Sequence, residues 1–471
     1  MHPEVSAGAS ISTGQTRVHP RTISRLVLST LLRSDSAALD SLRARIAVGA
    51  FWSLMGAGLG QGLSFLTTVL TARLLGAERY GQLGILISTI NLFATLAIVG
   101  LGTTATKYVA EYRNSDPARA GRIIGLSSVV AATSGLLVAG ILILFAPYVS
   151  EHVLKSAQLA PQLRLGALIL FFTAVNGAQT GALTGFEAFR ELAFANALRG
   201  AFMVPCVCAL TITGSVMGAI LGYGIVSVIA WFVYNRLIRA QCRKHNIAVS
   251  YAASRSELSL LWKFSIPVLI AGLAFTPAAW WCNALLAATA GYVQAGIFTA
   301  AFQFQIVMLF FAGALSNIAL PILSHTVPER NIEKYKRLLN LNTLATTGSV
   351  ALMAIPIALF APVLMRTYGQ GFQEGATVLR ILCLAAVIST LNNSIGHAIW
   401  SLNAACAGVF LSLLRSAALV GAGYVFVHKG AAGLATAYLV MAVIQTVTHY
   451  AFMGHLLNTC RLRWEAPEPA I

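Results

Sequence analysis

The feature that most constrains this chain is the length of its charge-poor apolar stretches. Residues 125–148 and 415–427 are too long and too apolar for buried strands, and a bilayer span needs about 20 such residues. Charged residues make up 10% of the chain and hydrophobic residues 57%, whereas about a quarter of an ordinary globular protein is charged. The sequence therefore predicts an all-α integral membrane protein and excludes water-soluble classes.

Apolar stretches bounded by charges and turn residues predict twelve transmembrane helices. They lie at about 48–73, 81–102, 122–147, 161–186, 192–213, 215–237, 262–287, 292–323, 338–364, 376–400, 404–427 and 431–457.

The basic residues predict the orientation of these helices. With twelve spans, 25 of the 32 Lys and Arg residues fall on the side that holds both termini and 7 on the other. Because basic loops stay in the cytoplasm, we expect both termini there, in a bacterial inner membrane. The net charge of +17 then reflects membrane topology, and we expect no nucleic-acid partner.

An internal repeat divides the chain into halves. The tetrapeptide LFAP occurs at 144–147 and again at 359–362, an offset of 215. YGQLGI at 80–85 resembles YVQAGI at 292–297 at an offset of 212. Arg164, Asn176 and Arg199 match Arg380, Asn392 and Arg415 at 216. Collinear matches predict a duplication of a six-helix unit. An even number of spans in each half makes the repeats parallel, related by an axis along the membrane normal.

The predicted domains follow from this duplication, which is typical of transporters that work by alternating access. The N-terminal tail could form a short helix on the membrane surface or a disordered basic segment. The parts are a basic cytoplasmic tail (1–47), an N-terminal six-helix lobe (48–238), a basic cytoplasmic loop (239–261), a C-terminal six-helix lobe (262–457) and a cytoplasmic tail (458–471).

The sequence carries no catalytic or cofactor-binding pattern. The seven cysteines form no CxxC pair, and no phosphate-binding glycine loop, nucleophile elbow or HExxH motif occurs. We expect no metal, no cofactor and no enzyme activity. A membrane ligase or polymerase for lipid-linked sugars is a weaker alternative, because it needs a large outer catalytic loop. Without an ATP-binding motif, a coupling ion such as H⁺ or Na⁺ is the expected energy source.

Four arginines inside predicted spans are candidate ligands for an anionic substrate. Arg199 and Arg415 lie a third to halfway into their spans, and Arg164 and Arg380 near outer helix ends. Guanidinium groups hold phosphate oxygens bidentately, which favours a cationic cavity. Snorkelling to the headgroups is the alternative, and it is favoured for Arg164 and Arg380.

Uncharged polar side chains at depth are a second set of candidates. Gln303 and Gln305 lie among phenylalanines, a mixture that suits either carbohydrate contact or helix packing. Carboxylates are absent at mid-span, which argues against the alternative of a multidrug exporter for cations.

Two motifs resemble the Wzx-type polysaccharide flippases of the multidrug/oligosaccharidyl-lipid/polysaccharide (MOP) exporter superfamily. ARLLGAERYG at 72–81 is similar to that family's A-R-L-L-G-P-E-x-Y-G, with Ala77 where Pro is usual. Gly100-Leu101-Gly102 followed by KYVAEYR at 107–113 is similar to its second-helix end. Arg73 and Lys107 lie in these motifs and join the substrate-binding candidates.

The resemblance implies a MATE-like fold with two lobes around a basic cavity. It implies a flippase for a polyprenyl-pyrophosphate-linked oligosaccharide used in O-antigen, capsule or exopolysaccharide synthesis. Expected partners are this lipid-linked sugar, membrane lipids and the polysaccharide polymerase machinery. A MATE-type multidrug exporter stays the main alternative.

Overall fold

The computed structural model describes residues 20–251, 254, 257–260, 265, 269, 273–326, 332–401 and 405–465. The chain divides into two units, Met1–Trp52 and Ser53–Ile471, which we describe separately. In the first unit, the described residues are helical from Pro20 onward, as the start of helix α1 (Pro20–Ile98). Parts of the predicted loop 239–261 and of the predicted span 262–287 lie outside the described residues.

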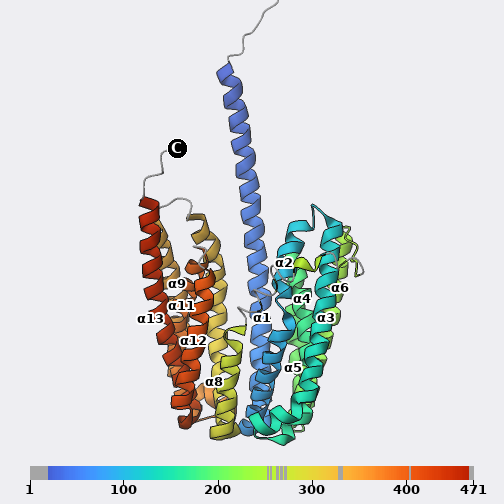
Figure 1. Ribbon diagram of the computed structural model, residues 1–471, viewed down its shortest axis with the longest axis vertical. Coiled ribbons are helices and arrows are strands. Elements are labelled where there is room, and N and C mark those ends of the chain that lie inside the picture. Colours follow the sequence, from blue (N-terminus) through green and yellow to red (C-terminus); the bar gives the residue numbers. More distant parts are fainter. Residues whose placement is uncertain are drawn as a thin grey trace, which may run out of the picture. The chain divides into compact units, whose positions relative to one another are not determined.

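The N-terminal half of the second unit consists of helices α1 to α6. Helix α1 is interrupted at Gly76, whose φ of 74° and ψ of 170° turn the chain back and separate two helical segments. Figure 1 shows the following helices gathered in one group. They are α2 (Leu101–Tyr112), α3 (Pro117–Tyr148), the short η1 (Val149–Val153) and η2 (Ala157–Leu159), α4 (Ala160–Gly185), α5 (Phe189–Thr211) and α6 (Val216–Lys244).

The C-terminal half repeats this plan. Helix α8 (Thr276–Thr326) is interrupted at Gly291, with φ 85° and ψ 169°. The remaining helices are α9 (Ile332–Leu359), α10 (Ala361–Arg366), α11 (Gly375–Ser401), α12 (Ala405–Phe426), η5 (Val427–Lys429) and α13 (Gly430–Glu465). Packing of α3 on α4, α4 on α6 and α5 on α6 recurs as α9 on α11, α11 on α13 and α12 on α13.

The apolar character of these helices identifies a multi-pass membrane protein. Within the described residues, nine stretches are long and apolar enough to cross a membrane. Three of them contain a chain reversal: Leu54–Ile98 at Gly76, Thr276–Gly313 at Gly291, and Gly408–Asn458 at the η5 turn. The all-helical membrane fold is confirmed, and the total of twelve helices stays a prediction.

The structure gives the register of the repeat. The interrupting glycines Gly76 and Gly291 are related by an offset of 215, the same as the two LFAP segments. The resemblance of YGQLGI to YVQAGI at 212 is therefore out of register. The two LFAP segments are also buried alike, because Ala146 and Ala361 are fully buried while the preceding Phe145 and Phe360 are exposed.

A side-chain contact that recurs in both halves supports the offset of 215. The Arg79 guanidinium donates to the carbonyl of Gly214 at 2.8 Å, and Gln294, at the position equivalent to Arg79, accepts from the backbone of Ala431 at 3.0 Å beside Gly430. Gly214 and Gly430 have φ values of 69° and 67°, in the left-handed region that glycine tolerates. The chain near the start of each lobe's last helix is therefore held by a side chain from an equivalent position.

The two halves contact each other at the chain reversals. A Cβ placed on Gly81 would lie 1.9 Å from the carbonyl oxygen of Tyr292, and one on Gly296 would lie 2.0 Å from that of Ala77. Gly81 and Gly296 are equivalent positions, as are Ala77 and Tyr292. Only glycine permits backbones to approach this closely, so the contact is a symmetric glycine pair, as at many helix interfaces in membranes.

Aromatic rings extend this contact. Phe65 meets Phe304 edge-on at 5.0 Å between ring centroids, and Tyr80 meets Tyr368 at 6.4 Å and Phe372 at 6.0 Å. Such pairs contribute about 0.5–1.5 kcal/mol each beyond their buried area. Together with the glycine pair they hold the two halves together at the chain reversals.

Candidate functional site: a pocket between equivalent helices

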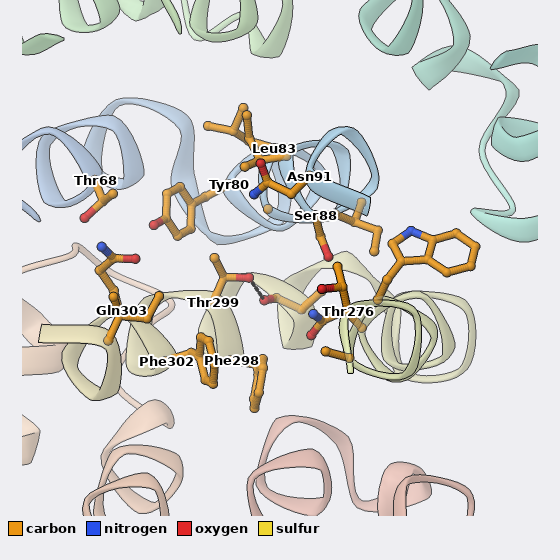
Figure 2. Close-up of a pocket in the computed structure, with 18 of the residues that line it drawn as sticks. Thr68, Tyr80, Leu83, Ser88, Asn91, Thr276, Phe298, Thr299, Phe302 and Gln303 are labelled. Carbon is orange, nitrogen blue, oxygen red and sulfur yellow. Dashed lines mark hydrogen bonds between the residues drawn. The ribbon is translucent and has the colours of Figure 1, made fainter. Parts of the chain in front are cut away.

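The candidate site is a pocket of about 330 Å³ between the two halves. Figure 2 shows Thr68, Tyr80 and Asn91 of α1 on one side, facing Thr299 and Gln303 of α8 on the other. Tyr223 of α6 also lines the pocket. The volume is at the lower end of the range of about 300–1,000 Å³ that ligand pockets occupy.

The lining follows the internal repeat. Seven positions on α1 line the pocket together with their equivalents on α8 at the offset of 215. The pairs are Thr68 and Asn283, Tyr80 and Ala295, Leu83 and Phe298, Gly84 and Thr299, Ile87 and Phe302, Ser88 and Gln303, and Asn91 and Ile306. Apart from the first pair, they lie on the same face of each half's second helical segment. The pocket therefore lies on the axis that relates the halves.

The paired positions differ in chemistry although they are equivalent in place. Tyr80 is equivalent to the small Ala295, Phe302 replaces Ile87, and the amide of Gln303 replaces the hydroxyl of Ser88. A symmetric scaffold therefore presents an asymmetric surface. Such a surface suits a ligand that has no twofold symmetry of its own.

The lining combines aromatic rings with uncharged hydrogen-bonding groups. Tyr80, Tyr223, Trp280, Phe298 and Phe302 supply the rings. Amides and hydroxyls supply donors and acceptors. Among the described residues that line the pocket, none is charged. This arrangement can stack on and hydrogen-bond a neutral polar ligand, and it offers no counter-ion to a bound cation.

Short contacts fix the two faces of the pocket. The Trp280 indole donates to the Thr89 hydroxyl at 3.0 Å, which joins the halves beside the pocket. A Cβ on Gly84 would lie 2.6 Å from the hydroxyl oxygen of Thr299. The α1 and α8 faces are thus held at a distance that a glycine at position 84 sets.

Arg199 lines a second cavity, which has a volume of about 220 Å³. Its other polar lining residues are Gln61, Ser64 and Asn196, and Phe310 of α8 contributes from the other half. Asn196 is fixed by the hydroxyl of Tyr234, which donates to its amide oxygen at 3.0 Å. The Arg199 side chain is exposed. A cation thus lies beside neutral hydrogen-bonding groups, where it can meet an anion.

Arg415 occupies the equivalent position in the other half but has different surroundings. Its guanidinium carbon lies 3.7 Å from the centroid of the Phe275 ring, a cation–π contact just before the start of α8. The Nε atom is buried without a hydrogen-bond partner within the described structure. Arg199 and Arg415 lie on equivalent helices but share no cavity within the described structure.

The other basic candidates lie apart from the pocket. Arg164 on α4 and Arg380 on α11 are exposed, and the Arg380 Nε donates to the Ala358 carbonyl at 3.3 Å. Arg73 is also exposed, and its Nε donates to the Thr367 carbonyl, a contact between the two halves. The Lys107 ammonium lies 5.0 Å from the centroid of the Tyr108 ring.

The two glutamine candidates differ in position, and two repeat-related asparagines serve in helix packing. Gln303 lines the pocket, whereas Gln305 is buried away from it, with its amide oxygen unpartnered in the described structure. Asn176 donates to the Ser227 carbonyl at 3.1 Å, and Asn392 donates to the Ala442 carbonyl at 3.4 Å. These two repeat-related amides tie each lobe's fourth helix to its last, so their role is interhelical.

Sequence reasoning missed most of the lining. From the sequence alone, Trp280 is interpreted as an interfacial tryptophan and Tyr80 as a structural residue of the hairpin motif. The signal that could have found them is the repeat itself at an offset of 215. Pocket positions on α1 recur with the spacing of three and four residues that marks one helix face, and the equivalent face of α8 faces it.

The fold of the chain is that of the MATE transporters. An inward-facing multidrug resistance MATE family transporter of the MOP superfamily matches with a TM-score of 0.75. The alignment covers 88% of this chain and 100% of that chain at 15% sequence identity. At this identity the likeness concerns the fold alone, and it confirms the expected MATE-like architecture.

The sequence places the chain in a family. Residues 46–327 match the model of the polysaccharide biosynthesis protein family, and the chain belongs to it. The EPS I polysaccharide export inner membrane protein EpsE of Ralstonia nicotianae is 25% identical over 87% of this chain and 95% of its own length. Stage V sporulation protein B of Bacillus subtilis is 22% identical, with 84% and 81% coverage. The expected relationship to the Wzx-like members of the MOP superfamily is confirmed.

Proposed function

We propose that this protein is a flippase that moves a polyprenyl-pyrophosphate-linked oligosaccharide across the bacterial inner membrane for cell-surface polysaccharide synthesis. The observation that carries the proposal is the pocket between α1 and α8, which is lined by aromatic and uncharged hydrogen-bonding side chains. Sugar rings have apolar faces that stack on aromatic side chains and hydroxyls that pair with amides and hydroxyls. At about 330 Å³ the pocket accommodates part of an oligosaccharide, not the whole unit.

The arginines suit the other end of the same substrate. A pyrophosphate carries negative charge on oxygens that a guanidinium can hold bidentately. Arg199 lies in a cavity with Gln61, Ser64 and Asn196, next to the other half at Phe310. In this proposal Arg199 binds the pyrophosphate, the neutral pocket binds sugar, and the polyprenyl tail stays in the bilayer. Arg415, with its unpartnered Nε, is a second candidate for the anion.

Alternating access supplies the movement. With both termini in the cytoplasm, the chain reversals at Gly76 and Gly291 lie on the outer side. The glycine pair Gly81 and Gly296, and the bond from Arg73 to Thr367, then close that side. Opening requires these contacts to separate while the lobes stay intact, as rocking of parallel repeats demands. Coupling to H⁺ or Na⁺ is part of this proposal.

The proposal is tested by complementation of a deletion strain, with mass spectrometry of polyprenyl-linked lipids as the readout. Loss of the protein should cause a complete, unpolymerised sugar unit to accumulate. Arg199→Ala, Arg415→Ala and Gln303→Leu should fail to clear it at normal protein levels in the membrane. Arg190→Ala, on the same helix as Arg199 but outside its cavity, is the matched control and should clear it.

The outcomes separate the alternatives. An unchanged lipid pool in the deletion strain would refute the flippase and favour export of another cargo. Accumulation that Arg199→Ala and Arg415→Ala both clear would keep the flippase and remove the assigned role of the arginines. Clearance by Gln303→Leu as complete as by Arg190→Ala would remove the sugar role of the neutral pocket.

A further inference from the structure

A separate basic cavity lies inside the N-terminal half, at the basic end of α6. It has a volume of about 690 Å³ and is lined by residues of α3, α4 and α6 and of the segment 247–251. It shares no lining residue with the pocket between α1 and α8. The proposed sugar cargo therefore does not account for it.

Three arginines form one wall of this cavity. Arg236, Arg239 and Arg243 are spaced by three and four residues, which places them on one face of α6. The ion pairs at this end of the described chain involve other arginines: Arg113 with Glu187, and Arg119 and Arg122 with Glu257. Among the described residues, none of the ion pairs includes Arg236, Arg239 or Arg243, so the wall presents three positive charges to the cavity.

Glycines of α3 bring the segment 247–251 close to that helix. A Cβ on Gly121 of α3 would lie 2.1 Å from the Ala248 carbonyl oxygen, and one on Gly125 would lie 2.4 Å from that of Ser250. The segment 247–251 therefore lies directly against α3. Ile247, Val249 and Tyr251 line the cavity, and their alternation gives it an apolar side.

The C-terminus of α6 does not repel an anion bound in this cavity. Asn246 has a left-handed φ of 53°, and the Ile247 amide donates to the Cys242 carbonyl at 2.8 Å. The His245 amide also donates to the Gln241 carbonyl at 3.0 Å. These bonds satisfy carbonyls at the helix C-terminus, whose partial negative charge would otherwise repel an anion.

A buried amide in the cavity points to a ligand. Gln179 of α4 has 7% of its surface exposed, and its Oε1 atom has no hydrogen-bond partner in the described structure. An unsatisfied buried amide oxygen costs about 1–3 kcal/mol. A ligand that carries both an anion and a hydroxyl would satisfy the arginine wall and this amide together.

We propose that this cavity binds the phosphate headgroup of an anionic glycerolipid. Phosphate oxygens pair with Arg236, Arg239 and Arg243, and a glycerol hydroxyl donates to Gln179. Basic pockets between helices at the membrane interface are suited to such headgroups. Tyr251, which is 62% exposed at the cavity, has an amphipathic side chain of the kind enriched at membrane interfaces. The lipid would hold the segment 247–251, and with it the beginning of the inter-lobe loop, against α3.

Native mass spectrometry of the full-length protein with added phosphatidylglycerol or phosphatidylcholine tests this proposal. The pocket variant is Arg239→Gln with Arg243→Gln. The control is Arg337→Gln with Arg366→Gln, which removes the same charge from exposed positions in the other half. We expect phosphatidylglycerol to bind the wild type and the control, and to bind the pocket variant at least about tenfold more weakly.

A variant that leaves the charge unchanged tests the same cavity if the double variant fails to fold. Gln179→Leu should also weaken phosphatidylglycerol binding, and thermal unfolding without lipid reports its folding. Equal binding by the pocket and control variants, or equal binding of phosphatidylcholine by the wild type, would overturn the proposal. Thermal stabilisation by inorganic phosphate as large as that by phosphatidylglycerol would assign the site to a free anion and overturn the lipid.

Discussion

Replacing Gly81 by alanine should open the contact between the two halves. The added Cβ would lie 1.9 Å from the Tyr292 carbonyl oxygen, whereas carbon and oxygen normally stay about 3.3 Å apart. The backbones must therefore separate by about 1.4 Å. Overpacking of this kind costs about 1–3 kcal/mol, which corresponds to a change of about 5- to 150-fold in the ratio of closed to open molecules.

Two measurements separate opening from unfolding. Alanine at a helical glycine site stabilises the helix by up to about 1 kcal/mol in both the closed and the open state, so it does not affect their ratio. The free energy of unfolding should thus fall by only about 0–2 kcal/mol. The closed state is measured by oxidative cross-linking of Gly84→Cys with Thr299→Cys in membranes, and stability is measured by thermal unfolding.

Gly62→Ala is the matched control for this prediction. Gly62 is on the helical segment of α1 that precedes Gly76, and nothing lies within 4 Å of a Cβ placed there. We expect Gly62→Ala to leave cross-linking unchanged and to raise stability slightly. Equal cross-linking yields in Gly81→Ala and Gly62→Ala would refute the reasoning, because the glycine pair would then not set the distance between the halves.

Two further predictions use contacts of the described residues. A Cβ on Gly84 would lie 3.3 Å from the Cβ of Thr299, close to the range of about 3.5–4.5 Å for a disulfide. Gly84→Cys with Thr299→Cys should therefore cross-link and, until reduced, block the proposed clearance of the lipid-linked sugar. Gly62→Cys with Thr299→Cys should do neither. Burial, followed by the charges of Arg113 and Lys244, lowers the pKa of His245 below its usual 6.5. Because the unfolded chain then binds more protons, stability should be full above pH 6.5 and fall as the pH drops towards the lowered pKa; a His245→Gln variant with the same loss below pH 6.5 would contradict this.

The sequence alone gave the internal repeat only in part. The LFAP segments gave the correct offset of 215, and in both copies the alanine is buried next to an exposed phenylalanine. The hairpin match at 212 was out of register because it aligned a short similarity, YGQ with YVQ, instead of the single glycines at which the chain turns. Gly76 and Gly291 carry the constraint, since their backbone angles suit glycine alone. An alignment of the two halves by their turn glycines, instead of by similar residues, would have given the offset of 215 for this hairpin as well.

The candidate site was only partly predictable for a related reason. Depth and symmetry singled out Arg199 and Arg415, but they could not tell that one lines a cavity and the other lies over Phe275. Gln303 was a candidate with two interpretations, and the structure places it in the pocket. The role of each side chain depends on which helix packs against it. A single sequence does not reveal which helix that is.

The sequence by itself determined the membrane class and the all-helical fold, because long apolar runs form helices in a bilayer. It also predicted the duplication, because a repeat leaves matching residues at a nearly constant offset. Only the tertiary structure decided which faces meet. The pocket exists because the same face of α1 and α8 comes together across the axis between the halves, and because Gly81, Gly84 and Gly296 let the backbones approach. Those contacts join positions that lie nearly half the chain apart, where local patterns exert no constraint.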